Sequence, residues 1–298
     1  MKNQHLPRIL KLKFSVIILA FMMSCSLKSQ IDIQGHRGCR GLFPENSLPA
    51  FEYAIKLGVH TLELDIAITK DKQVIVTHEP FMSRTICLNP EGNPIAKNND
   101  KQFNLYEMTH DDIKRFDCGT KLHSRFPKQA KVKVYKPLLK EVFDLVKQHQ
   151  SDVRLNIEIK SKPEYYGIYT PQPSEYVKLV LNEIKSEGFG SRVNLQSFDL
   201  TILEEIKKQS PEMQVAILVD EDESISKKLD QLSYKPEIIS PYFKLLSKAL
   251  VSEYKNQNFK IIPWTVNKEK DMHKMLDFNV DGIITDYPNR LIEILKNM

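Results

Sequence analysis

The sequence predicts an α/β fold, a (βα)8 barrel of the TIM type, with a small insertion after the strand that ends at His78. Three observations lead to this prediction. The chain has 298 residues, 41% of them hydrophobic, and one such barrel takes roughly 250 residues. Short apolar runs alternate with amphipathic stretches, which is typical of parallel strands joined by crossover helices. One pair of strand candidates lies too close in sequence for a parallel connection.

The strand candidates number nine, one more than a barrel needs. They are Ile31–His36, Thr61–Thr69, Val74–His78, Val153–Lys160, Val193–Phe198, Met213–Val219, Glu237–Ser240, Lys260–Val266 and Gly282–Thr285. The helix candidates include Ser47–Leu57, Leu138–His149, Ser174–Ser186, Leu200–Gln209, Ser247–Asn256 and Lys268–Phe278. Residues 79–136 show little periodicity, so we expect an insertion over one mouth of the barrel, with a short helix near Asp111–Phe116.

The second and third strand candidates are separated only by Lys70–Gln73. A parallel crossover needs a dozen or more residues, so these two runs should form an antiparallel hairpin, and the other eight should close the barrel. With a two-residue tip, Thr69 faces Lys72, and the register then places Glu63 opposite His78.

The N-terminal segment has the pattern of an export signal. Residues 1–24 carry four basic side chains and no acid, and the apolar run Phe14–Met23 is too short to span a bilayer. A small residue before Cys25 favours lipoprotein processing, although a plain cleaved signal peptide is the alternative. We therefore expect a signal peptide over 1–24, a tether over 25–30, and a barrel over 31–298. The protein would be an exported, membrane-anchored lipoprotein facing the periplasm or the cell exterior.

Charge and cysteine content exclude two classes of site. Without residues 1–24, the chain keeps 39 basic and 38 acidic side chains, so no strong basic field remains to attract nucleic acid. The other cysteines, Cys39, Cys87 and Cys118, lack the C-x-x-C spacing of a thiolate zinc site. They permit one disulfide, whose pairing stays open, and no obligate protein partner is inferred.

Three carboxylates are candidate metal ligands. Glu63 and Asp65 are two residues apart on a strand, so they share one face, while the apolar residues between and beside them share the other. Alternation in Leu155–Lys160 places Glu158 on the polar side of another strand. A salt bridge plus one exposed acid, or a half-exposed edge strand, would be the structural alternatives. Three oxygen ligands without cysteine indicate one divalent cation, Ca²⁺ or Mg²⁺, and the expected export of the protein favours Ca²⁺.

Two histidines stand at strand ends, where barrels of this type place their active sites. His36 and His78 have side chains that can take and give protons near neutral pH. Arg37 offers a fork of donors to phosphate oxygens, and Lys160 a point charge. Trp264 could wall a small-molecule pocket or belong to the core.

Together these residues resemble the motif series of the glycerophosphodiester phosphodiesterases, in family order over most of the chain. The matching stretches are His36–Gly38, Pro44–Ser47, Glu63–Asp65, His78, Glu158–Lys160, Trp264–Asn267 and Asp281–Pro288. In Pro44–Ser47, helix capping by Asn46 or Ser47 is an alternative reason for the pattern. The family commonly has Asp after the second histidine, where this chain has Glu79.

The resemblance implies hydrolysis of a glycerophosphodiester to glycerol 3-phosphate and an alcohol. It implies a metal held by Glu63, Asp65 and Glu158, and an acid–base pair in which His36 is the base and His78 the acid. A lysophospholipase D-like activity on the same site, another phosphodiester substrate, or a lipoprotein that binds phosphodiesters without cleaving them are the alternatives. Direct attack by water and a cyclic intermediate both remain open.

Overall fold

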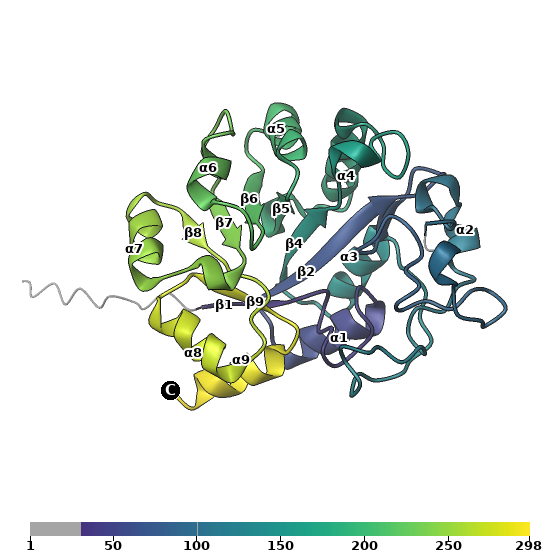
Figure 1. The fold of residues 1–298 in the computed structure, drawn as a ribbon, viewed down its shortest axis with the longest axis horizontal. Coiled ribbons are helices and arrows are strands. Elements are labelled where there is room, and N and C mark those ends of the chain that lie inside the picture. The colour runs from purple at the N-terminus through teal and green to yellow at the C-terminus, as the bar shows by residue number, and fades with distance from the viewer. Residues whose placement is uncertain (1–30, 100) are drawn as a thin grey trace, which may run out of the picture.

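The fold is known from a computed structural model that describes residues 31–99 and 101–298. Eight parallel strands form its centre, with helices between them (Figure 1). The strands are β1 (Asp32–Gly35), β2 (Thr61–Ile68), β4 (Arg154–Ile159), β5 (Val193–Ser197), β6 (Gln214–Val219), β7 (Ile238–Pro241), β8 (Lys260–Ile261) and β9 (Gly282–Thr285).

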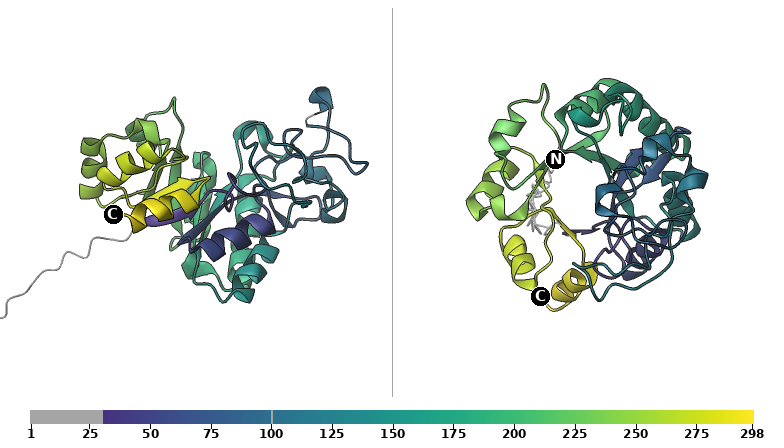
Figure 2. Two further views of the ribbon diagram at one scale, coloured as in Figure 1. Left: turned by 90° about the horizontal axis from the view of Figure 1, so that it is seen from below. Right: turned by 45° about the vertical axis from the view of Figure 1, so that its right-hand side comes forward.

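The strands are hydrogen-bonded in the order β8-β7-β6-β5-β4-β2-β1-β9. The two end strands also approach each other, because the amide of Ile284 donates to the carbonyl of Pro263 at 3.0 Å and that of Asp281 to Ile261 at 2.9 Å. The sheet is therefore a near-closed barrel, seen as a ring in Figure 2, and the predicted fold class is confirmed.

The ninth strand, β3 (Val74–Val76), pairs with β2 in antiparallel fashion, as expected. Its register differs from the prediction, because Ile66 lies opposite Val76. The tip holds three residues rather than two, with Lys72 at φ 62°, and the Thr69 amide donates to the Gln73 carbonyl at 3.1 Å. The prediction that Glu63 faces His78 was therefore wrong, since a longer tip shifts the register by one residue.

All six helix candidates are present, with boundaries that differ by at most one residue at either end. The helices are α1 (Leu48–Leu57), α2 (His110–Ile113), α3 (Leu139–Gln148), α4 (Pro173–Ser186), α5 (Leu200–Gln209), α6 (Ile225–Leu229), α7 (Lys248–Asn256), α8 (Glu269–Asp277) and α9 (Pro288–Lys296). The short helix expected near 111–116 corresponds to α2. No helix in the described part of the chain is long and apolar enough to cross a membrane, and the predicted signal, lipidation site and tether lie outside it.

Strand alternation separates two layers of side chains. Leu62, Leu64 and Ile66 are fully buried against the helices. The opposite face of the strands carries a polar layer inside the barrel, where Asn156 Nδ2 donates to Gln34 Oε1 at 2.9 Å and to Gln196 Oε1 at 3.1 Å. Buried polar groups are tolerated where they are hydrogen-bonded, so this layer forms a floor beneath the carboxyl ends of β2 and β4.

The insertion runs from the end of β3 to α3 and lies beside the far end of β2 (Figure 1). It contains α2 and two short 3₁₀ turns, Lys97–Asn99 and Leu105–Glu107. Its own apolar cluster includes Met82, Leu105 and Ile113. A disulfide joins Cys87 to Cys118, which settles the pairing that the sequence left open, and Cys39 is free and buried.

Candidate active site

The three candidate carboxylates converge at the carboxyl ends of two neighbouring strands. Asp65 lies opposite Glu158 in the parallel pairing of β2 with β4. One oxygen from each of Glu63, Asp65 and Glu158 lies within 4.8 Å of the other two. All three side chains are buried, so the alternatives of an exposed acid or an exposed edge strand do not hold.

The carboxylates are only partly satisfied by protein donors. Glu63 accepts from the Arg37 amide at 2.9 Å and from Gln196 at 3.0 Å. Asp65 accepts from Asn46 Nδ2 at 2.8 Å through Oδ2, whereas its buried Oδ1 has no partner. A buried acceptor without a donor is costly. An unpaired oxygen in a cluster of three carboxylates fits a hard cation with oxygen ligands.

Electrostatics point in the same direction. Burial, with Asp65 next, raises the pKa of Glu63 well above its usual range, and burial raises that of Glu158 to about 7. Arg37, against the effect of burial, holds the pKa of Asp65 well below its usual range. Adjacent buried carboxylates repel unless a cation neutralises them, so a bound cation would stabilise this cluster.

His36, at the end of β1, is fixed by a distant acid. Its Nδ1 lies 2.6 Å from Asp286 Oδ1, and its Nε2 lies 3.9 Å from Glu63 Oε2. Burial, reinforced by Arg40 and opposed by Asp286, lowers the pKa of His36 to about 4. The ring is therefore neutral near pH 7. A proton on Nδ1, donated to the carboxylate, leaves the Nε2 lone pair directed at the carboxylate cluster.

His78 has a different pair of neighbours. Its Nδ1 lies 2.8 Å from Glu79 Oε1, and its Nε2 lies 3.2 Å from Lys160 Nζ. Lys160 also donates to Glu158 at 2.7 Å, and so it links this histidine to the carboxylate cluster. Burial, with Arg37 and Lys160 next, lowers the pKa of His78.

Arg37 joins the cluster to a residue to which the sequence reasoning gave no role. Its Nε lies 3.1 Å from Asp65 Oδ2 and its Nη1 lies 2.9 Å from Glu45 Oε1. In Pro44–Ser47, only Ser47 acts as the cap of α1, accepting from the Ala50 amide. Glu45 and Asn46 instead contact the site, so capping does not account for the whole motif.

Asp286 organises a second group that sequence reasoning missed. Besides His36, it accepts from Arg40 Nε at 2.8 Å and from Asn267 Nδ2 at 2.7 Å. These residues lie within or beside the motif stretches, but their spacing along the chain gave no hint of this contact. The residue pair His36 and Asp286 is 250 positions apart in sequence.

A cavity of about 470 Å³ opens over the cluster. Its polar lining includes His36, Arg37, His78 and Lys160, and its apolar lining includes Phe198, Leu218, Trp264 and Ile284. The Trp264 indole donates to the Ser240 carbonyl at 2.9 Å and meets Phe198 edge-on at 5.5 Å. The indole thus lines the cavity while it packs on its neighbours. The site can hold an anionic phosphate beside two histidines, with apolar side chains also in its lining.

Comparisons with known proteins identify the family of this chain. The model of the glycerophosphoryl diester phosphodiesterase family matches residues 36–290. A glycerophosphodiester phosphodiesterase of Caldanaerobacter subterraneus is 32% identical over 265 residues, covering 88% of this chain and 96% of that protein. A lysophospholipase D of Rattus norvegicus is 25% identical, with 88% and 85% covered.

Solved structures show the same architecture. A candidate glycerophosphoryl diester phosphodiesterase from Silicibacter pomeroyi superposes with a TM-score of 0.81 at 29% identity, covering 91% of this chain and 94% of that one. A phosphodiesterase from Oleispira antarctica, solved with its product sn-glycerol-3-phosphate, superposes with a TM-score of 0.70 at 20% identity, covering 89% and 96%. At that identity, the second likeness supports the fold alone.

Proposed function

Since the chain belongs to the glycerophosphoryl diester phosphodiesterase family and is a phosphodiesterase, we propose that it cleaves glycerophosphodiesters by paired histidine chemistry beside a divalent cation. The products are glycerol 3-phosphate and an alcohol. The proposal is supported by three buried carboxylates that converge, one of them with an unpaired oxygen. Two histidines lie beside them: His36 contacts Asp286, whereas His78 contacts Glu79 and Lys160.

Glu63, Asp65 and Glu158 would hold the cation, for which Ca²⁺ is favoured and Mg²⁺ is the alternative. When bound, it supplies positive charge that offsets the negative charge growing on the phosphate. Arg37 adds fixed donors on the same side. Its guanidinium is already held by Asp65 and Glu45, so it needs little reorganisation to meet a phosphate oxygen.

His36 is the proposed base. It is neutral near pH 7, and Asp286 fixes the ring so that Nε2 carries the lone pair that accepts a proton from the attacking oxygen. The developing imidazolium is stabilised by the same carboxylate. Whether the attacking oxygen belongs to water or to the glycerol 2-hydroxyl does not alter this role.

His78 is the proposed acid. In the free protein, Lys160 opposes a proton on its Nε2. A phosphodiester anion attracts Lys160 Nζ and adds negative charge nearby, and Glu79 already accepts from the other ring nitrogen. Substrate binding therefore favours the imidazolium, which can give its proton to the leaving oxygen.

A second candidate substrate is a lysophospholipid. The apolar side of the cavity, with Phe198, Leu218, Trp264 and Ile284, offers a surface for an acyl chain, and one relative is named a lysophospholipase D. Such a substrate would use the same cluster and the same histidines. A lipoprotein that only binds phosphodiesters is the remaining alternative, and nothing in the site's residue types favours it.

One assay distinguishes these functions. The purified protein is incubated with glycerophosphocholine or with lysophosphatidylcholine, with and without a chelator, and glycerol 3-phosphate, lysophosphatidic acid and choline are measured. Release of glycerol 3-phosphate that stops with chelator supports the proposal. Faster cleavage of lysophosphatidylcholine would favour the lipid substrate. Retention of glycerophosphocholine without choline release would favour a binding protein.

We also propose that the protein is exported and anchored by a lipid on Cys25. The basic and apolar pattern of residues 1–24 supports this location, and the Cys87–Cys118 disulfide is typical of an oxidising compartment. Metabolic labelling with a fatty acid should mark the wild-type protein and not a Cys25→Ala variant.

A further inference from the structure

A second, smaller cavity lies beneath the insertion. It has a volume of about 180 Å³. It shares Arg37, Arg40, His78 and Arg125 with the larger cavity described above, so these four side chains form a common wall. The remaining lining is contributed by Glu45 and by residues of the insertion, among them Ser83, Thr85, His123 and Lys136.

Lys136 is the unexplained residue of this cavity. Its side chain is only 4% exposed, and its ammonium has no hydrogen bond or ion pair among the residues that the structure describes. Burial lowers the pKa of Lys136 to about 8, which Glu45, Glu79 and Asp65 partly oppose. Lysine is almost never buried without a partner, so this side chain is suited to pair with an anion that enters the cavity.

The backbone directs this lysine inward. The Val76 amide donates to the Pro137 carbonyl at 2.8 Å, and the Cys118 amide donates to the Val134 carbonyl at 2.8 Å. The Lys136 carbonyl itself receives His110 Nε2 at 3.2 Å. The segment is therefore held on both sides of Lys136, whose side chain lines the cavity.

The charges around the cavity leave a positive excess. The lining holds the cations Arg37, Arg40, Arg125 and Lys136 and the carboxylates Glu45 and Glu79. Glu45 Oε1 is paired with Arg37 at 2.9 Å, and its Oε2 lies 3.7 Å from Arg40. Arg40 is also held by Asp286. In the described chain, Lys136 and Arg125 are then the two lining cations with no acidic partner. Both can meet an added anion.

The positions of the two histidines indicate which part of a substrate would enter the smaller cavity. His36, the proposed base, lines the larger cavity only, whereas His78, the proposed acid, lines both. The leaving oxygen lies beside the acid, so the leaving alcohol extends toward the insertion. We propose that the smaller cavity is a subsite for an anionic group on that alcohol, a second phosphate or a carboxylate, bound by Lys136. This inference rests on the proposed function.

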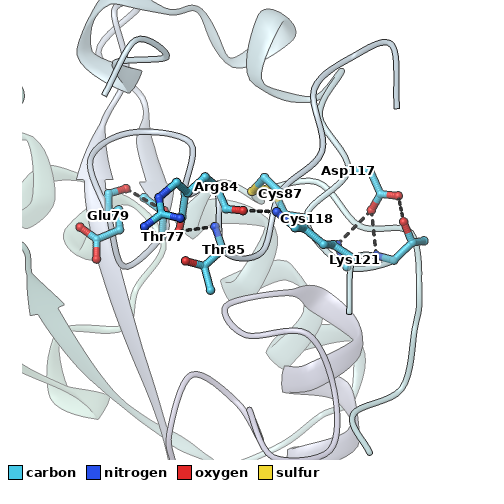
Figure 3. The surroundings of a disulfide bond; sticks show 11 residues. Thr77, Glu79, Arg84, Thr85, Cys87, Asp117, Cys118 and Lys121 are labelled. Atoms are coloured by element: carbon cyan, nitrogen blue, oxygen red, sulfur yellow. Dashed lines mark hydrogen bonds between the residues drawn. A yellow bond between two sulfur atoms is a disulfide. The ribbon is translucent and has the colours of Figure 1, made fainter. Parts of the chain in front are cut away.

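The disulfide between Cys87 and Cys118 lies close to Thr85, a residue that lines the cavity (Figure 3). Thr85 and Ile86 line the cavity, and Cys87 follows them, with its amide bonded to the Ser83 carbonyl at 2.9 Å. Cys118, its partner, is bonded to the strand-like segment that leads to Lys136. Lys121 Nζ donates to the Arg84 carbonyl nearby. The cross-link thus joins the segment that contributes Thr85 and Ile86 to the segment that is bonded to Val134, two residues before Lys136.

Three matched substrates test the proposal: glycerophosphoglycerol, its terminal phosphate monoester, and glycerophosphoglyceric acid, which carries a carboxylate. The wild-type protein should show a higher kcat/KM for one or both anionic substrates than for the neutral one. Preference for the phosphate alone, or for both anions, identifies which group the subsite accepts. In Lys136→Met the preference should fall by about 10- to 100-fold, as expected for one charge-assisted hydrogen bond.

Two variants control this experiment. Lys133→Met removes an exposed lysine three residues away and should keep the preference, and Lys136→Arg should keep much of it. Equal kcat/KM for all three substrates in the wild type, or an unchanged preference in folded Lys136→Met, would overturn the proposal. If no substrate is cleaved, the proposed function fails, and calorimetry still tests the subsite. Tighter binding of the phosphate monoester than of glycerophosphoglycerol, lost in Lys136→Met, supports it, and equal binding overturns it.

Discussion

His36 Nδ1 lies 2.6 Å from Asp286 Oδ1, which joins the end of the first strand to the start of the last helix. Asp286 also accepts from Arg40 and Asn267. His36 and Arg40, against the effect of burial, hold the pKa of Asp286 well below its usual range, so it stays ionised. An ionised acceptor at Nδ1 fixes the ring orientation and tautomer that a base at Nε2 requires.

Asp286→Asn should therefore lower kcat for glycerophosphocholine by about 10²- to 10⁴-fold, the range of a proton-transfer group, with little change in KM. The amide can no longer stabilise an imidazolium through its charge. Asn267→Ala is the matched control, because it removes another partner of Asp286 and leaves the bond to His36. Equal losses in the two variants would show that Asp286 acts only as a structural anchor.

The difference between what could and could not be predicted follows from sequence distance. Glu63, Asp65 and Glu158 were predictable because strand alternation sets the face of a side chain locally. The contact of His36 with Asp286 depends on closure of the barrel, which no local pattern encodes.

The hairpin of β2 and β3 was also predictable only in part. The antiparallel pairing was predictable from the short connection, but its register was not, because Lys72 adopts positive φ and adds one residue to the tip. His78 still lines the site, and the Thr77 amide before it donates to the Asp65 carbonyl at 2.8 Å, beside the carboxylate cluster. The cavity at Lys136 was not predictable either, because residues 79–136 show no periodicity that places side chains.

Metal removal gives a direct test of the carboxylate cluster. Chelator should abolish activity, and Ca²⁺ or Mg²⁺ should restore it. Ca²⁺ at about 100 times its Kd should also stabilise the folded protein by about 2.7 kcal/mol, measured as a rise in Tm. Asp65→Asn or Glu63→Gln should remove both effects. Glu45→Gln, which alters a partner of Arg37 but no proposed ligand, should keep the rise in Tm. Full activity in excess chelator would contradict the assignment.

The disulfide should stabilise the insertion measurably. A cross-link between residues separated by 31 positions restricts the unfolded chain by roughly 4 kcal/mol in the entropic model. The double variant Cys87→Ser/Cys118→Ser should lose stability of that order in chemical denaturation. Reductant should lower the stability of the wild type and leave the double variant unchanged. Cys39→Ser, which removes no cross-link, should keep the response to reductant.

The buried charge of Lys136 should lower the free energy of unfolding of the protein. Its folded-state pKa of about 8 lies below the 10.5 of an ordinary lysine. Below pH 8 the side chain is charged in both states, and the folded state carries a penalty of roughly 3 kcal/mol. Between pH 8 and 10.5 the folded protein loses the proton first, so the penalty shrinks as pH rises.

Lys136→Met should therefore be more stable than the wild type at pH 7, and its advantage should decline toward pH 10. Denaturation curves at several pH values measure this difference. Lys133→Met, at an exposed position, should show no such advantage. A lower stability of Lys136→Met at pH 7 would indicate that the ammonium has a stabilising partner in the folded protein.

The two histidines can be separated by the quality of the leaving group. A general acid matters most when the leaving oxygen is a poor one, because that oxygen needs a proton as its bond breaks. The alcohol of glycerophosphocholine is poor, whereas p-nitrophenolate is good. His78→Ala should lower the rate for glycerophosphocholine by about 10²- to 10⁴-fold and affect a p-nitrophenyl ester of glycerol phosphate far less.

His36→Ala should lower both rates to a similar degree, because the attacking oxygen is the same in the two substrates. Lys160, which lies 3.2 Å from His78 Nε2, provides an internal check. If Lys160 binds the phosphate rather than supplying the proton, Lys160→Met should slow both substrates alike, as His36→Ala does. Rescue of His36→Ala by the good leaving group would reverse the two assignments. Equal losses in His36→Ala and His78→Ala on both substrates would leave neither histidine as the acid, and the proton would then have to come from solvent.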